Sequence, residues 1–185
     1  MDLRTYAITL VVGMTLLTAG CKTKSIPAHF APLEQLVERP FGDNSFVTTL
    51  HTNVWVSDID DYLKRHPEGS YSYNATMIHE RIHSIRMGNV FTTVWFTLQY
   101  LFNTDFMWSE EQLGWYFDIQ YKRSKGILKQ AEYYAIVLAG YSNTTGKMIT
   151  YNKALLWVRD VFSGNWKPNL TPEEWAAYAP PKETN

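Results

Sequence analysis

The sequence predicts an α+β fold that is mainly helical, with a small β-sheet near the N-terminus. The segment Ser45–Ser57 is rich in β-branched and aromatic residues in partial alternation, which is typical of one bent strand or two short ones. Downstream of Asp58 the apolar stretches instead have helical spacing. With 185 residues, 45% of them hydrophobic and 19% charged, the chain is long enough for one folded domain.

The first twenty residues have the pattern of an export signal and are excluded from the fold. A charged start at Arg4 precedes the apolar run Tyr6–Leu17, and small residues then lead to Cys21. The order Leu17-Thr18-Ala19-Gly20-Cys21 resembles the bacterial lipoprotein signal, in which the cysteine is acylated and begins the mature protein. Cys21 is the only cysteine, so no disulfide can form within the chain. The alternative is a simple cleaved signal or an uncleaved anchor, with Cys21 incidental.

The lipoprotein pattern implies a membrane attachment through acylated Cys21. Lys22 follows the cysteine instead of an aspartate, which by resemblance favours the outer membrane if the host has two membranes. Residues 21–44 contain three prolines and few apolar runs, so we expect a tether with a short helix at Pro32–Glu38. The folded body is then expected over residues 45–178, followed by a flexible tail over 179–185.

The body is expected to contain seven helices. Ser57-Asp58, followed by Asp60-Asp61, can cap a short helix through Lys64, and Asn74 caps a helix that runs to Met87 and stops at Gly88. The next helix, Phe91–Phe102, is almost wholly apolar and is expected to be buried. The next three are predicted at Ser109–Lys122, Ile127–Gly140 and Met148–Phe162. The seventh helix is short and starts at Thr171-Pro172-Glu173-Glu174.

The most informative motif is His79-Glu80-Arg81-Ile82-His83, an H-E-x-x-H sequence within the helix that ends at Met87. An α-helix advances 100° per residue, so His79 and His83 project from one face, one turn apart. Two imidazoles in this arrangement can hold one Zn²⁺ at about 2.0–2.1 Å. Glu80 can then act as general base on a metal-bound water. The alternative is an accidental occurrence of the pentad.

These residues resemble the zincin metallopeptidases, over roughly Leu50 to Tyr141. The resemblance implies an edge strand above the motif helix, within Leu50–Ser57, that receives a peptide substrate in extended form. It also implies zinc as the cofactor and hydrolysis of peptide bonds.

A catalytic zinc needs a third protein ligand, and no histidine follows His83. Glu132 is the first candidate, because it is a single carboxylate in an apolar helical stretch where an unpaired charge would be costly. Its position on a later helix resembles the gluzincin plan, in which a downstream glutamate completes the site. Glu111 is the second candidate. The alternative for Glu132 is a solvated side chain, or one paired with Lys129 or Arg86.

The sequence thus predicts a zinc metallopeptidase of the cell envelope that acts on a peptide or protein. A non-catalytic envelope lipoprotein that binds a partner, with a structural or vestigial metal site, is the alternative, and the high aromatic content favours it. A metallohydrolase acting on another bond, such as a cell-wall amide, also stays open. Nucleic acid is not an expected partner, because 17 basic and 18 acidic residues leave the chain nearly neutral, with no basic block.

Overall fold

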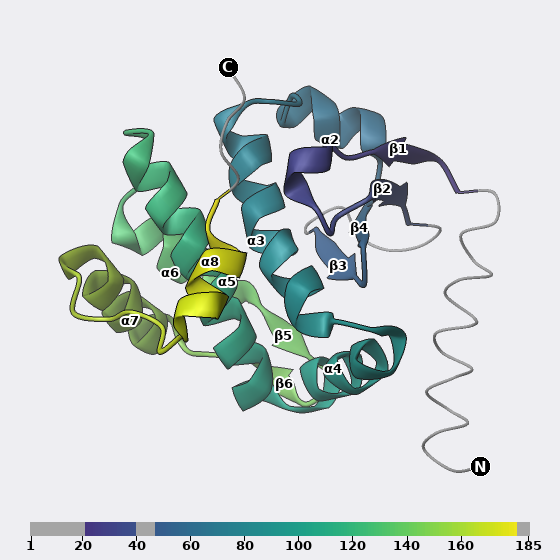
Figure 1. Cartoon of the computed structure of the whole chain (residues 1–185). Helices are drawn as coiled ribbons and strands as arrows, with labels where there is room; N and C mark the ends of the chain where they lie inside the picture. Colours follow the sequence, from purple (N-terminus) through teal and green to yellow (C-terminus); the bar gives the residue numbers. More distant parts are fainter. Residues whose placement is uncertain (1–20, 40–46, 181–185) are drawn as a thin grey trace, which may run out of the picture. The chain divides into compact units, whose positions relative to one another are not determined.

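The computed structural model describes residues 21–39 and 47–180. It confirms the mainly helical α+β class, with a four-stranded sheet near the N-terminus (Figure 1). The chain divides into two compact units, with the boundary between Thr97 and Leu98 inside helix α4 (Val90–Phe102). The predicted signal peptide and most of the flexible tail lie outside the described residues.

The sheet belongs to the N-terminal unit and has the order β1-β2-β4-β3. Its strands are β1 (Thr23–Ser25), β2 (Gln35–Glu38), β3 (Thr48–Leu50) and β4 (Asn53–Val56). Strands β2 and β4 are parallel, and the two outer pairs are antiparallel. The segment predicted as one bent strand or two short ones is therefore two strands. The edge strand predicted within Leu50–Ser57 is wrong, because the strand in that segment is β4, which pairs on both sides. The edge strand that packs against α3 is β3, which ends at Leu50.

The tether predicted over residues 21–44 is wrong for its described part, because two strands of the sheet come from it. The Glu38 N–H donates to the Lys22 carbonyl at 2.9 Å, so the chain is already part of the sheet one residue after Cys21. The predicted helix at Pro32–Glu38 is also wrong. Leu36 and Val37 point to opposite faces of β2 and both are buried, because β2 is an inner strand.

Helices α2 and α3 complete most of the N-terminal unit, together with the short 3₁₀ helix η1 (Ala28–Phe30). Helix α2 (Ile59–Arg65) is capped by Asp58 as predicted, since its carboxylate accepts from Asp61 N–H at 2.8 Å. Helix α3 (Tyr71–Met87) begins before the predicted cap Asn74, because the Ser70 hydroxyl accepts from Tyr73 N–H at 3.2 Å. Gly88 ends it with φ 63°, as the sequence predicts.

The C-terminal unit contains the end of α4 and four further helices. They are α5 (Thr104–Ser124), α6 (Ala131–Gly140), α7 (Tyr151–Ser163) and α8 (Pro172–Tyr178). A hairpin of β5 (Ser142–Asn143) and β6 (Gly146–Lys147) separates α6 from α7. The capping signal at Thr171 is confirmed by a reciprocal pair of hydrogen bonds with Glu174.

Several predicted helices differ from the observed ones, and α7 begins at Tyr151 instead of the predicted Met148. Helix α5 begins at Thr104 instead of Ser109, because the Asn103 side chain accepts from Asp105 N–H and Phe106 N–H, both at 3.1 Å. Helix α6 begins four residues later than the predicted Ile127. Helix α4 begins one residue before the predicted Phe91, and it is not buried throughout as expected, since Phe91 and Trp95 are exposed.

Within the described residues, no helix combines the length and apolar character that crossing a membrane requires.

Candidate metal centre

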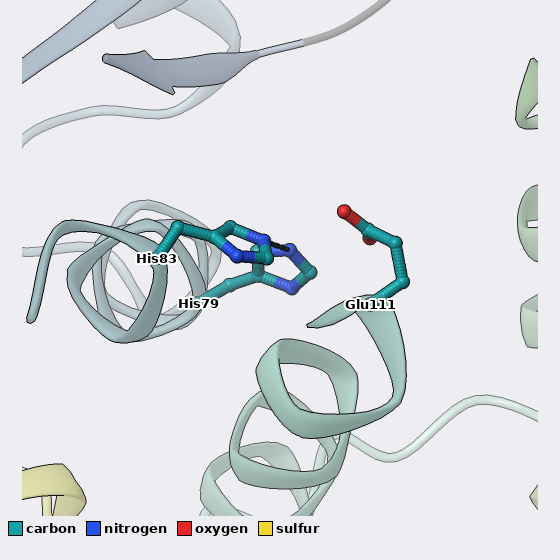
Figure 2. A group of neighbouring side chains, drawn as sticks. All are labelled: His79, His83 and Glu111. Atoms are coloured by element: carbon teal, nitrogen blue, oxygen red, sulfur yellow. Dashed lines mark hydrogen bonds between the residues drawn. The ribbon is translucent and has the colours of Figure 1, made fainter. Parts of the chain in front are cut away.

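Helix α3 presents the two histidines of the H-E-x-x-H motif on one face, one turn apart. Their Nε2 atoms lie 3.0 Å from each other, and the ring planes are inclined by 66° (Figure 2). Both side chains are buried. The helix is fixed by Tyr73, Met77 and Ile82 on its buried side, each of which contributes about 1.5–3 kcal/mol if fully removed from water.

The spacing of the two Nε2 atoms fits one bound metal ion. Two nitrogens 3.0 Å apart can both lie about 2.0–2.1 Å from one ion, which is the distance at which imidazoles bind zinc. A hydrogen bond between two neutral imidazoles would satisfy the same 3.0 Å spacing. The two imidazoles are therefore close enough to bind one metal ion without a large rearrangement.

Glu80, between the two histidines in sequence, is buried and held by the edge strand. The Thr49 hydroxyl of β3 donates to Glu80 Oε2 at 2.7 Å, and Thr49 is itself buried. The Arg39 guanidinium interacts electrostatically with this carboxylate. Burial lowers the pKa of Arg39, and the negative charge of Glu80 opposes that shift. A threonine hydroxyl and a nearby cation thus both lie beside the Glu80 carboxylate.

Glu111 is buried on α5 and is held by two donors of the C-terminal unit. The Tyr100 hydroxyl donates to Oε1 at 2.5 Å, and Trp115 Nε1–H donates to Oε2 at 3.1 Å. Tyr100 comes from α4, whereas Trp115 follows Glu111 by one turn of α5. The two donors therefore bond to different oxygens of the same carboxylate.

His79, His83 and Glu111 form a buried group that could hold a metal ion (Figure 2). One ligand atom from each residue lies within 4.8 Å of the other two. Two imidazole nitrogens and one carboxylate oxygen suit Zn²⁺. The same donors also bind other divalent transition metals, so the set does not determine the metal.

Glu132, the first candidate for the third ligand, does not belong to this group. It lies in the first turn of α6, and its carboxylate accepts from Arg159 Nη2 at 3.0 Å. The two side chains are 46% and 58% exposed, so this is a surface ion pair. The pKa of Glu132 is lowered by its own backbone N–H and then by Arg159. The preference for Glu132 over Glu111 is therefore corrected, because a charge assumed to be buried faces solvent and has a cation of its own.

Four residues around the site were not predicted from the sequence. Thr49 and Arg39 lie beside Glu80, while Tyr100 and Trp115 hold Glu111. Only Trp115 has a sequence signal, because residues four apart on a helix lie on the same face. The other three approach through pairings distant in sequence. Cys21, the predicted lipidation site, lies at the start of the described residues and is partly buried.

A comparison of the chain with models of known protein families finds no match, and comparisons with curated proteins and with solved structures find none either. The candidate site therefore depends on this chain's own residues and their geometry.

Proposed function

We propose that this chain is a zinc-dependent metallopeptidase of the cell envelope. His79, His83 and Glu111 would hold the metal, and Glu80 would act as the general base. The group of two histidines and one glutamate is the observation that carries the proposal, since all three side chains are buried and their ligand atoms lie within 4.8 Å. Three protein ligands are the number found at catalytic zinc sites, where the fourth position takes water or substrate.

In the H-E-x-x-H motif, Glu80 directly follows the proposed ligand His79, and this position suits a general base beside the metal. A bound zinc ion would lower the pKa of a coordinated water to about 7. Glu80 would take a proton from this water and later give it to the leaving amine. Thr49 engages Oε2 of Glu80, so we assign proton transfer to the other oxygen, Oε1.

The N-terminal sequence supports a location at the envelope. Acylation of Cys21 would attach the chain to a membrane, and Lys22 favours the outer membrane in a host with two membranes. Because β1 begins at Thr23, such an anchor would hold the sheet directly at the membrane surface, without a long linker. The substrate would then be a peptide or protein at that surface.

The test combines metal content with activity on a mixed peptide library. The full chain, purified in detergent from a host that processes lipoproteins, is expected to contain about one zinc ion per molecule. Glu80→Gln should keep the zinc and lose peptide hydrolysis, whereas Glu110→Gln makes the same change at another buried glutamate and should keep both. A folded wild-type chain without zinc would exclude the proposal. Zinc without hydrolysis of any peptide would favour the binding lipoprotein instead.

A further inference from the structure

From the hydrogen bonds of Glu111 we infer that Tyr100 and Trp115 are positioning residues for the metal site. Together they hold the carboxylate in the orientation in which it binds a metal. The inference rests on the proposed function in one respect, namely that Glu111 is a metal ligand. It adds two residues that the H-E-x-x-H motif does not include.

The first argument is that the two donors form hydrogen bonds with different oxygens of one buried carboxylate. Tyr100 bonds to Oε1 and Trp115 bonds to Oε2. Two fixed donors in different directions prevent rotation of the carboxylate about its terminal bond. Each carboxylate oxygen has two lone pairs, so one hydrogen bond does not use the whole acceptor capacity of that oxygen. Partners that orient a ligand in this way are a general feature of metal sites.

The second argument is that both donors are themselves held in place. Near the end of α4, Asn143 Nδ2 donates to the Tyr100 carbonyl at 3.0 Å, and Thr144 N–H donates to the Leu101 carbonyl at 3.2 Å. The β5–β6 hairpin thus fixes the turn of α4 that carries Tyr100.

Trp115 is fixed by aromatic and cationic neighbours. Its ring meets the Tyr134 ring edge-on, with centroids 5.9 Å apart. Lys122 Nζ lies 5.6 Å from the centroid of the Trp115 ring, and it is held by Asp118 at 2.8 Å. The contacts with Tyr134 and Lys122 hold the indole of Trp115 in one orientation, so packing determines the direction of its N–H.

A purely structural role is the competing explanation, because a buried carboxylate needs donors whether or not it binds a metal. That role would cost stability when a donor is removed, but it would leave the metal affinity of the folded protein unchanged. Metal affinity measured on folded protein therefore separates the two explanations.

The experiment measures Zn²⁺ affinity by competition with a chelating dye, and the visible spectrum of the Co²⁺-loaded chain, for Tyr100→Phe and Trp115→Phe. Each variant is expected to bind Zn²⁺ about 10- to 100-fold more weakly and to change the Co²⁺ bands. Tyr116→Phe on α5 and Trp157→Phe on α7 are controls that make the same side-chain changes at residues with other aromatic neighbours, and they should bind within about twofold of wild type. Circular dichroism establishes that each variant is folded, and either variant alone suffices if the other does not fold.

Glu111→Ala separates failure of this inference from failure of the proposed function. If Glu111→Ala loses the metal while Tyr100→Phe and Trp115→Phe bind like the wild type, the positioning role is wrong and the ligand set stands. If Glu111→Ala binds as tightly as the wild type, the proposed ligand set is wrong, and the positioning role is wrong with it.

Discussion

Replacement of Thr49 by valine tests how the edge strand holds Glu80. Valine keeps the shape of threonine but removes the hydroxyl that donates to Glu80 Oε2 at 2.7 Å. Both residues are buried, so water does not readily replace the lost donor. A hydrogen bond to a charged group contributes about 1.5–3 kcal/mol, and Thr49→Val should lower the free energy of unfolding by about that amount.

Thermal unfolding followed by circular dichroism measures this loss. For a chain of this length each kcal/mol shifts the midpoint by roughly 2–4 °C, so a decrease of about 3–12 °C is expected. Thr49→Ser keeps the hydroxyl and should recover most of the loss. Thr48→Val is the matched control, because Thr48 lies next to Thr49 on β3 and is less buried.

A double-mutant cycle with Glu80→Ala decides whether the loss comes from this hydrogen bond. Without the carboxylate, the Thr49 hydroxyl is buried without its acceptor, so Thr49→Val should cost almost nothing or become stabilising. The reasoning is refuted if Thr49→Val costs the same in both backgrounds, or if Thr48→Val costs as much as Thr49→Val.

Three further predictions concern other parts of the chain. Glu132→Ala should leave both the Zn²⁺ affinity and the midpoint of thermal unfolding essentially unchanged, because it removes only a surface ion pair. Loss of zinc in a competition titration would restore Glu132 as a ligand. Gly88→Ala should lower the free energy of unfolding, measured in urea, by about 1–3 kcal/mol, because Gly88 has φ 63° and ψ −121° and a Cβ there would lie 3.0 Å from Thr92 Oγ1. Gly126 also has a positive φ but lies in open space, so Gly126→Ala should lower the free energy of unfolding by less. Equal losses in the two variants would contradict the steric argument. Cys21→Ala should abolish labelling by radioactive palmitate and release the chain from membranes, and a variant that still pellets with membranes would exclude acylation as the anchor.

Features that depend on a few neighbouring residues were predictable from the sequence. The caps at Asp58 and Thr171 and the stop at Gly88 were each confirmed, since a cap is a hydrogen bond or a backbone angle within one helical turn. The pairing of His79 with His83 follows in the same way from the helical repeat. Ser70 was missed as the start of α3, because Asn74 is an equally good capping residue four positions later.

Features that depend on contacts between distant segments were not predictable. Strands β1 and β2 lie in a segment rich in proline, and only their pairing with β4 and with each other makes them strands. The choice between Glu111 and Glu132 depends on which carboxylate faces the interior. Both glutamates lie on helices with apolar neighbours in sequence. The Glu132 carboxylate pairs with Arg159, which lies 27 residues further along the chain, whereas the Glu111 carboxylate accepts a hydrogen bond from Tyr100.

The position of a bound metal is the most direct test of the central claim. A crystal of the chain grown with zinc, with diffraction recorded on both sides of the zinc absorption edge, locates the ion by its anomalous scattering. The account predicts one peak at about 2.0–2.2 Å from an Nε2 or Nδ1 atom of each of His79 and His83 and from a carboxylate oxygen of Glu111. A peak elsewhere, or no peak at these histidines in a chain that binds zinc in solution, would contradict it.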